Sequence, residues 1–199
     1  MSVSNATRRA MGTTAAVTVH GGRLDADDVL AEIDRLEKSW SRFRPDSELS
    51  RLNDCGGSLT VVSATLLVLV EHLMAAHRLT GGRFDPTMGA HIAALGYDRT
   101  YRDLSDGSRQ PVRPLPDVVG ADDVVVIPST SAVLLPAGVR LDPGGLGKGL
   151  AADLAATMAC DAGADGVLLD LGGDIVTRGS APDGSAWRID VPSTGVQPR

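Results

Sequence analysis

The chain has 199 residues, 43% of them hydrophobic and 22% charged, which is typical of a soluble globular protein with one sizeable core. Its formal net charge of −6 argues against nucleic acid or an anionic membrane surface as the main partner. Cys55 and Cys160, its two cysteines, indicate neither a disulfide framework nor a zinc site. Without a signal-peptide pattern or about 18 consecutive apolar residues, we expect a cytoplasmic protein with no membrane anchor.

The N-terminal part combines a strand signal with a helix signal. Residues 13–19 are rich in Thr, Val and Ala and end at a double glycine, which predicts a first strand. Asp25 or Asp27 can cap a helix that ends near residues 44–45. Apolar residues spaced at four, three and four positions up to Trp40 form one helical stripe. We therefore expect Trp40 in the core.

A polar segment with apolar residues at intervals follows, over residues 41–53. Ser47 and Asn53 can be interpreted as a short capped helical turn and nothing more. A second helix begins at Ser63 or Thr65 and ends at the next double glycine. His72 and His77 are five positions apart, so a helical metal pair is not expected, because such a pair needs a spacing of four.

The segment from Gly81 to Gly89 places two glycines before Arg83, Phe84 and Asp85. This arrangement allows backbone and ring to meet a flat ligand, although a loop with one buried Phe explains it equally well. For His91, just beyond, the sequence does not separate a ligand role from a packing role.

The second half of the chain is predicted to be mainly strands. Residues 99–120 read as a surface connection rich in Pro, Arg, Asp and Gly. Short strands are expected in a meander, followed after the next helix by a buried strand and its continuation, with one last candidate strand. The ranges are 124–127, 132–135 and 139–141, then 167–171 and 175–177, and finally 187–191.

A glycine-dense turn over residues 142–149, followed at once by a helix, organises the chain. Four glycines within six residues cost chain entropy, and such a turn is favoured where backbone must approach something closely. The helix start offers N–H groups and a positive dipole end that suit an anion such as phosphate. Lys148 adds a movable cation, and Asp142 adds an oxygen able to hold a metal or a ribose hydroxyl. The alternative is an ordinary strand-to-helix turn with Lys148 in solvent.

The turn matches neither of two familiar phosphate motifs. Asp142 stands where a P-loop needs its first glycine, and Gly149 replaces the hydroxyl that would hold magnesium. The dinucleotide fingerprint needs G-x-G-x-x-G, whereas the chain has G-x-G-x-G from Gly145. The turn and the later Gly172-Gly173 pair are expected at the ends of neighbouring strands, which is a good place for a ligand cleft.

Five stretches in the same order resemble one family, the ApbE family of FAD:protein FMN transferases. They span nearly the whole chain: Met11-Gly-Thr13, Ser41-Arg-Phe-Arg-Pro-Asp-Ser-Glu-Leu-Ser-Arg-Leu-Asn53, Gly82-Arg-Phe-Asp-Pro-Thr-Met-Gly89, Leu141-Asp-Pro-Gly-Gly-Leu-Gly-Lys-Gly149 and Leu171-Gly-Gly-Asp174.

The resemblance implies a single α+β domain over residues 1–199, of the T-fold-like kind, with a mixed, mostly antiparallel sheet and packed helices. It also implies FAD as substrate and Mg²⁺-dependent transfer of FMN to a Thr or Ser hydroxyl of an acceptor flavoprotein, with release of AMP. Gly145 resembles the residue whose carbonyl helps to hold the metal. The expected FAD contacts are Met11, Phe43, Arg83, Phe84, Asp85, Asp142 and Lys148.

One departure from the family stands out. Family members continue beyond the position equivalent to Arg199, and the resemblance implies that this C-terminal part supplies the remaining magnesium ligands. Oxygen-only magnesium sites usually need carboxylates, so the site is expected to be incomplete. This leaves two alternatives to an active transferase: a catalytically impaired FAD-binding or regulatory remnant, or a fragment that cannot fold stably alone.

Overall fold

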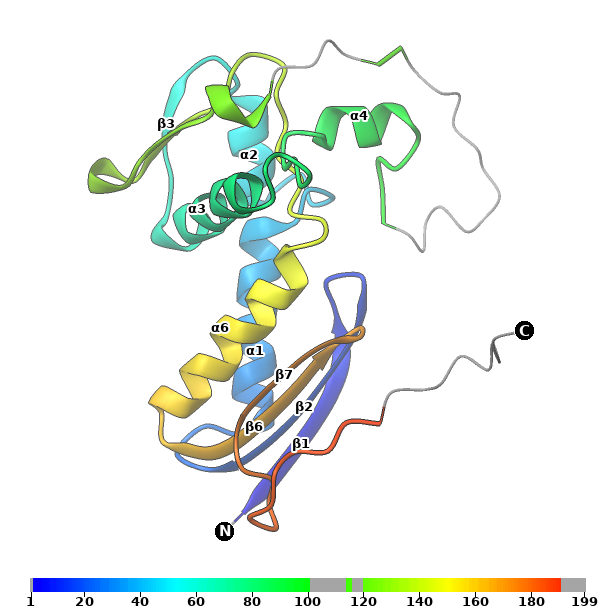
Figure 1. Cartoon of the computed structure of the whole chain (residues 1–199), viewed down its shortest axis with the longest axis vertical. Coiled ribbons are helices and arrows are strands. Elements are labelled where there is room, and N and C mark those ends of the chain that lie inside the picture. Colours follow the sequence, from blue (N-terminus) through cyan, green and yellow to red (C-terminus); the bar gives the residue numbers. More distant parts are fainter. Residues whose placement is uncertain (1, 101–113, 116–119, 191–199) are drawn as a thin grey trace.

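A computed structural model describes residues 2–100, 114–115 and 120–190 of the chain. Figure 1 shows a larger sheet backed by two long helices at one end and smaller elements gathered at the other. The elements are β1 (Val3–Ala10), β2 (Thr13–Gly21), α1 (Ala26–Trp40), α2 (Glu48–Asp54), β3 (Leu59–Val61), α3 (Ala64–Leu79), α4 (Gly89–Ala94), η1 (Ala121–Asp123), β4 (Val125–Ile127), η2 (Pro128–Thr130), β5 (Ala132–Leu134), α6 (Gly147–Asp161), β6 (Ala164–Leu171) and β7 (Asp174–Gly179).

The larger sheet is antiparallel throughout, with the strand order β1-β2-β6-β7. A two-residue turn, Met11-Gly12, joins β1 to β2, and both residues have positive φ, 49° and 76°. Positive φ at both central positions defines the type I′ turn that suits the twist of a hairpin. Such a backbone is strained at a non-glycine residue, so Met11 is held at the hairpin tip at a conformational cost.

Helices α1 and α6 pack together over one face of this sheet (Figure 1). Asp25 caps α1 by accepting the N–H of Asp28, while Asp28 accepts the N–H of Asp25; this reciprocal arrangement is a capping box. Alanines on α6 and branched side chains on α1 are fully buried. Small residues on one helix allow the other to approach closely, so the two helices form a rigid layer.

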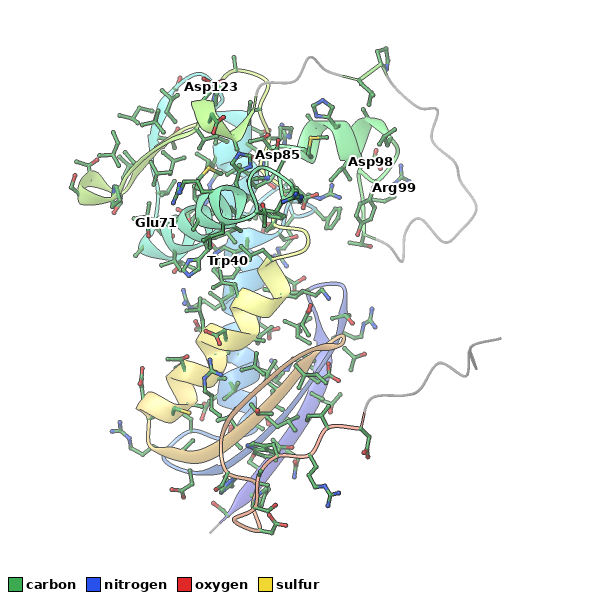
Figure 2. The ribbon with its side chains drawn as sticks, viewed as in Figure 1. Trp40, Glu71, Asp85, Asp98, Arg99 and Asp123 are labelled. Carbon is green, nitrogen blue, oxygen red and sulfur yellow. The ribbon has the colours of Figure 1, made fainter. Side chains whose placement is uncertain are left out.

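The smaller sheet has the order β3-β5-β4, again antiparallel, and lies beside α2 and α3 (Figure 1). Trp40, the last residue of α1, is 2% exposed, and its indole N–H donates to the carbonyl of Thr65 at 3.0 Å. Trp40 therefore connects α1 to α3 between the two ends of the molecule (Figure 2). Its predicted place in the core is confirmed.

Most predicted helices and strands are present. The helix of residues 26–40 is capped by Asp25, and Ser47 caps α2, so the short helical turn is confirmed. Ser63 caps α3. The predicted strands at 13–19, 124–127, 132–135, 167–171 and 175–177 correspond to β2, β4, β5, β6 and β7.

Several boundaries differ from the prediction. The first helix ends at Trp40, before the expected residues 44–45. Residues 139–141 form no strand, only a bridge between Arg140 and Met88. Residues 187–190 are not a strand either; Val191 and most of the predicted 99–120 connection lie outside the described residues.

Two further differences concern β1 and the connections. The strand of residues 13–19 is the second strand, because β1 precedes it, and β3 rather than residues 139–141 completes the smaller sheet.

Within the described part of the chain, no helix combines the length and apolarity that crossing a membrane requires.

Candidate functional site

A cavity of about 340 Å³ lies between the β1–β2 turn, the loop after α1 and the start of α6. This volume falls within the range of small-molecule sites. Four of the predicted ligand contacts line it together: Met11, Phe43, Asp142 and Lys148. The other lining residues are Gly12, Glu37, Trp40, Ser41, Arg42, Arg44, Tyr97, Thr100, Pro143, Gly144 and Gly147.

The hairpin tip forms one wall of this cavity. The backbone N–H of Met11 donates to the Glu37 carboxylate at 2.7 Å, which ties the tip to α1. Met11 is half-buried and its side chain packs against the core. The contact explains how the strained turn keeps a long apolar side chain beside the cavity.

Asp142, at the start of the glycine turn, is buried and already paired. Its carboxylate accepts the Nε–H of Arg42 at 3.0 Å and the N–H of Gly144 at 2.8 Å. Its own N–H donates to the carbonyl of Pro86 at 2.8 Å. Asp142 thus shapes the turn, and its carboxylate would have to exchange a partner in order to hold a metal or a ribose hydroxyl.

Phe43 and Tyr97 form an aromatic pair beside Arg42. Their ring centroids are 5.5 Å apart and the planes meet at 64°. The guanidinium carbon of Arg42 lies 4.1 Å from the Phe43 centroid and 4.6 Å from the Tyr97 centroid. These contacts are short enough for cation–π attraction, so Arg42 and the two rings hold each other in place.

The glycine turn leads directly into α6, which begins at Gly147. No side chain caps this helix. Pro143 accepts N–H groups from Leu146 and Gly147 at 3.1 and 2.7 Å. With the Gly147 N–H bonded to Pro143, the N–H donors that remain in the first turn are those of Lys148 and Gly149. The positive dipole end lies at the cavity that Gly147 and Lys148 line.

Lys148 extends from this first turn and meets the second glycine pair. Its Nζ lies 2.7 Å from a carboxylate oxygen of Asp174, and both side chains are about half exposed, at 41% and 46%. The two glycine turns are thus close together, as expected. They do not end neighbouring strands, because the first follows no strand of the larger sheet; α6 brings them together.

The segment of Arg83, Phe84 and Asp85 does not line the cavity. Asp85 accepts both the N–H and the hydroxyl of Thr87, at 2.8 and 2.5 Å. Phe84 is half-buried against the core. A Cβ placed on Gly145 would lie 3.8 Å from the Phe84 ring, so the ring packs beside the glycine whose carbonyl is the candidate metal ligand.

The segment that follows supports the glycine turn by close backbone contact. Gly89 donates its N–H to the carbonyl of Arg140 at 3.0 Å. A Cβ at position 89 would lie only 2.6 Å from that oxygen. Only glycine fits there, because a side chain would force the two backbones apart.

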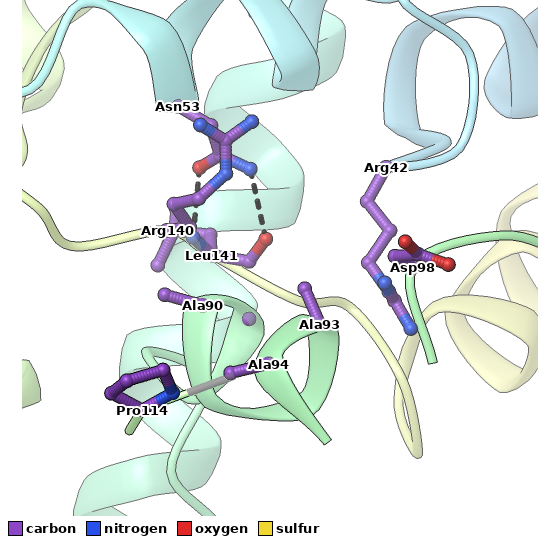
Figure 3. Close-up of a pocket in the computed structure, with 10 residues that line it drawn as sticks. Arg42, Asn53, Ala90, Ala93, Ala94, Asp98, Pro114, Arg140 and Leu141 are labelled. Atoms are coloured by element: carbon purple, nitrogen blue, oxygen red, sulfur yellow. Dashed lines mark hydrogen bonds between the residues drawn. The ribbon is translucent and has the colours of Figure 1, made fainter. Parts of the chain in front are cut away.

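A second cavity, of about 440 Å³, lies on the other side of Arg42. Asn53, Arg140 and Leu141 border it opposite Arg42, and the alanines of α4 line its floor in this view (Figure 3). Asp98, in the segment after α4, lines the cavity beside Arg42 (Figures 2 and 3). Arg42 is a lining residue of both cavities, so the two spaces share one wall.

The described residues do not fit a complete magnesium site. Among residues 2–100, 114–115 and 120–190, no group of three or more His, Cys, Asp or Glu side chains could hold a metal ion. Asp142 is held by Arg42 and Asp174 by Lys148. Among the described residues, the Gly145 carbonyl therefore lacks the carboxylate ligands that would complete a magnesium site.

One carboxyl group at the rim of the site has a shifted pKa. Asp46 lies 3.2 Å from the Arg44 guanidinium, and the hydrogen bond from Arg44 is the main cause that lowers the pKa of Asp46. Arg44 also lines the first cavity. This exposed ion pair holds one side of the loop that carries Arg42 and Phe43.

The sequence analysis missed Arg42 and Tyr97 as site residues. Arg42 stood within a quoted motif and Tyr97 was one of only six aromatic residues, but no local spacing linked them. His72 and His77 bond the carbonyls of Val68 and Phe84 at 2.7 and 2.9 Å.

The sequence model of the ApbE family matches residues 11–197 of this chain. An FAD:protein FMN transferase of Vibrio cholerae serotype O1 is 27% identical over 196 residues, which cover 95% of this chain and 58% of that protein. One of Treponema pallidum is 29% identical over 180 residues, covering 85% and 50%. The chain thus spans about half the length of these curated relatives.

Solved structures show the same fold. A flavin transferase ApbE from Vibrio cholerae matches with a TM-score of 0.78 at 24% identity, covering 96% of this chain and 63% of that one. The apo form of a Pseudomonas stutzeri flavinyl transferase ApbE matches with a TM-score of 0.77 at 22% identity, covering 96% and 62%. The predicted α+β architecture is confirmed.

Proposed function

The chain belongs to the ApbE family, and on that premise we propose that it is an FAD:protein FMN transferase. In this reaction FMN passes from FAD to a Thr or Ser hydroxyl of an acceptor flavoprotein, and AMP is released. The curated relatives with that name are about twice as long as the part they share with this chain. The activity, the substrate and the partner are therefore proposed for this chain from its relatives and its site.

The observation that supports FAD binding most directly is the position of the glycine turn. The uncapped start of α6 and Lys148 face the same cavity as Met11 and Phe43. A diphosphate is favoured at such a helix start, and an isoalloxazine ring matches the apolar side chains opposite. FAD has an anionic diphosphate between two flat aromatic ring systems, so its diphosphate matches the start of α6 and a ring matches the apolar side chains opposite.

For this reaction the protein mainly has to position the acceptor hydroxyl and the diphosphate and to neutralise charge. The acceptor oxygen forms a bond to the phosphorus on the FMN side, its proton leaves, and the bond from that phosphorus to the AMP phosphate oxygen breaks. Lys148 and the N–H groups of α6 would hold the diphosphate oxygens while charge shifts onto AMP. Lys148 can turn from Asp174 to the diphosphate at little cost, because exposed ion pairs contribute about 0–1 kcal/mol.

Magnesium dependence belongs to the proposal through the family resemblance. Gly145 is the proposed carbonyl ligand. We further propose that residues 1–199 form one domain, since core residues of both ends belong to one buried cluster, and that the protein acts in the cytoplasm.

The test is a titration of the protein with FAD, with and without Mg²⁺, followed by mass spectrometry of candidate acceptor flavoproteins. We expect AMP release and an acceptor heavier by one FMN. A folded sample that binds FAD but labels no acceptor under any metal condition would contradict the transferase assignment.

A second function is favoured by one observation, the pairing of Asp142 with Arg42 and Gly144. If that carboxylate stays paired, the chain is a catalytically impaired FAD-binding or regulatory member of the family. FAD affinity that does not change with Mg²⁺ would support this function, whereas repeated turnover would exclude it.

A further inference from the structure

Arg42 is a buried cation with two of its three guanidinium nitrogens engaged. Its side chain is 9% exposed, and Nε pairs with Asp142 at 3.0 Å. Nη1 donates to the carbonyl of Tyr97 at 2.8 Å. Nη2 is buried and has no hydrogen-bond partner in the part of the chain that the structure describes.

A buried donor without a partner is unusual in a folded protein. Most buried polar atoms are hydrogen-bonded, because desolvation of an unpaired group is unfavourable. The guanidinium is fixed by Asp142, the Tyr97 carbonyl and two aromatic rings, so it cannot rotate to satisfy Nη2 elsewhere. Arg42 lines both cavities, so its guanidinium borders the space that a ligand would enter.

The surroundings of Arg42 restrict the kind of acceptor. Asp142 already neutralises the guanidinium, and its carboxylate would repel a phosphate brought to the same group. A neutral acceptor, such as a carbonyl oxygen or a ring nitrogen, meets no such repulsion. The Phe43 and Tyr97 rings beside Arg42 also favour a flat heteroaromatic ring over a phosphate.

We propose that Nη2 of Arg42 donates a hydrogen bond to a carbonyl oxygen or ring nitrogen of one heteroaromatic ring of FAD. Arg42 is then a specificity-determining residue that fixes how this ring is oriented. This inference rests on the proposed function, because it takes FAD as the ligand. The flavin and the adenine are the two rings that carry the required acceptor atoms.

The test compares the wild type with Arg42→Lys. Lysine keeps a cation for Asp142 but cannot reach three acceptors at once from the same position. Arg42→Gln is a second variant that supplies neutral amide donors, and thermal melts show which variants are folded. Arg78→Lys is the matched control, because Arg78 is an exposed arginine of α3 that lines neither cavity. Each protein is titrated with FAD by calorimetry, and riboflavin and adenosine, which carry no phosphate, are measured by competition with FAD.

The expected result is that Arg42→Lys weakens FAD binding by about 10- to 100-fold, as for loss of a hydrogen bond to a charged donor, while Arg78→Lys does not. The same factor should appear for only one neutral ligand, riboflavin if Arg42 contacts the flavin and adenosine if it contacts the adenine. Unchanged FAD affinity in a folded variant would overturn the inference and leave the proposed function standing. The inference would also be overturned if Arg42→Lys weakened FAD binding but left the affinities for riboflavin and adenosine unchanged, because that result indicates a contact with phosphate. A wild type that binds no FAD would overturn the proposed function, and the inference with it.

Discussion

Asn53 and Leu141 are 88 positions apart in the chain and exchange two buried hydrogen bonds. The side-chain amide of Asn53 donates to the Leu141 carbonyl at 3.0 Å and accepts the Leu141 N–H at 2.7 Å. Asn53 lies in the last turn of α2, which follows the Arg42–Phe43 loop, and Leu141 precedes the glycine turn. The amide therefore positions two walls of the site relative to each other.

Replacing Asn53 by Ala should strongly destabilise the fold. Both backbone groups of Leu141 would be left buried without these partners, and each such loss costs about 1–3 kcal/mol. We expect a loss of about 2–4 kcal/mol in the free energy of unfolding, measured by urea denaturation. Asn5→Ala, on the exposed edge strand β1, is the control; it loses only an exposed bond from the Thr18 hydroxyl at 2.7 Å and should change it by less than about 1 kcal/mol. Equal effects of both substitutions would contradict the role assigned to Asn53.

Ser47→Ala should destabilise α2 and the loop before it. The Ser47 hydroxyl accepts the N–H of Ser50 at 3.0 Å and donates to the Ser41 carbonyl at 2.5 Å. Loss of an N-cap typically costs about 1–2 kcal/mol, and urea denaturation should show a loss of at least that size because the site is buried. Ser58→Ala, at an exposed serine, should leave the denaturation midpoint in place; a midpoint unchanged by Ser47→Ala as well would refute the capping argument.

Lys148→Ala should weaken FAD binding without unfolding the protein. The lost contact to the diphosphate is expected to reduce affinity by about tenfold or more, measured by FAD fluorescence. Loss of the exposed pair with Asp174 should change stability by less than about 1 kcal/mol. Lys38→Ala, at the other lysine of the chain, is the matched control on the surface of α1. If the Lys148 variant keeps full affinity, the side chain is a solvent-exposed cation with no part in binding.

Met11→Asn should separate stability from binding. Asn tolerates the positive φ of this turn and Asn-Gly is the favoured type I′ pair, so strain of about 1–2 kcal/mol is relieved. We expect a melting temperature equal to or above that of the wild type, although an apolar side chain is lost, together with weaker FAD binding. A clear fall in melting temperature would show that packing of Met11 outweighs the backbone strain.

The carboxyl of Asp46 should titrate below its usual value of 3.8, because the Arg44 hydrogen bond favours the charged form. A lowered pKa means that the pair stabilises the fold above the unfolded-state value, and that this contribution is lost as pH falls through the lowered pKa. NMR titration of the side-chain carbon checks the direction. Arg44→Gln should raise the Asp46 pKa, while Asp183, whose pKa is lowered by Ser185, should not move. An unchanged Asp46 titration in that variant would exclude Arg44 as the cause.

The parts of the fold that could be predicted are those with local signals. Helix α1 shows an acidic cap and a regular apolar stripe, and β6 contains the apolar run 167–169. Strand β1 escaped prediction because it is an edge strand: alternate residues face solvent, and its sequence is mostly small and polar. Residues 139–141 look like a strand because apolar Val139 and Leu141 flank Arg140, but they contact α2 and α4 instead of a sheet neighbour.

The candidate site was predicted in part for the same reason. The glycine turn has a strong local pattern, and motif resemblance linked it to Met11 and Phe43, which do line one cavity with it. The segment 83–85 was grouped with them, yet it does not line that cavity: Arg83 and Asp85 bond to Thr80 and Thr87, and only the Phe84 ring lies near the turn. Pairing of Arg42 with Asp142 depends on residues 100 positions apart, a relation that no local pattern encodes.

The close approach of Gly89 to Arg140 limits how the site can change shape. There is no room for even a methyl group between the two backbones. The first turn of α4 and residues 139–141 therefore have to move together. A larger residue at position 89 would force the two backbones apart, whereas substitutions at the outer end of α4 can change the width of the larger cavity.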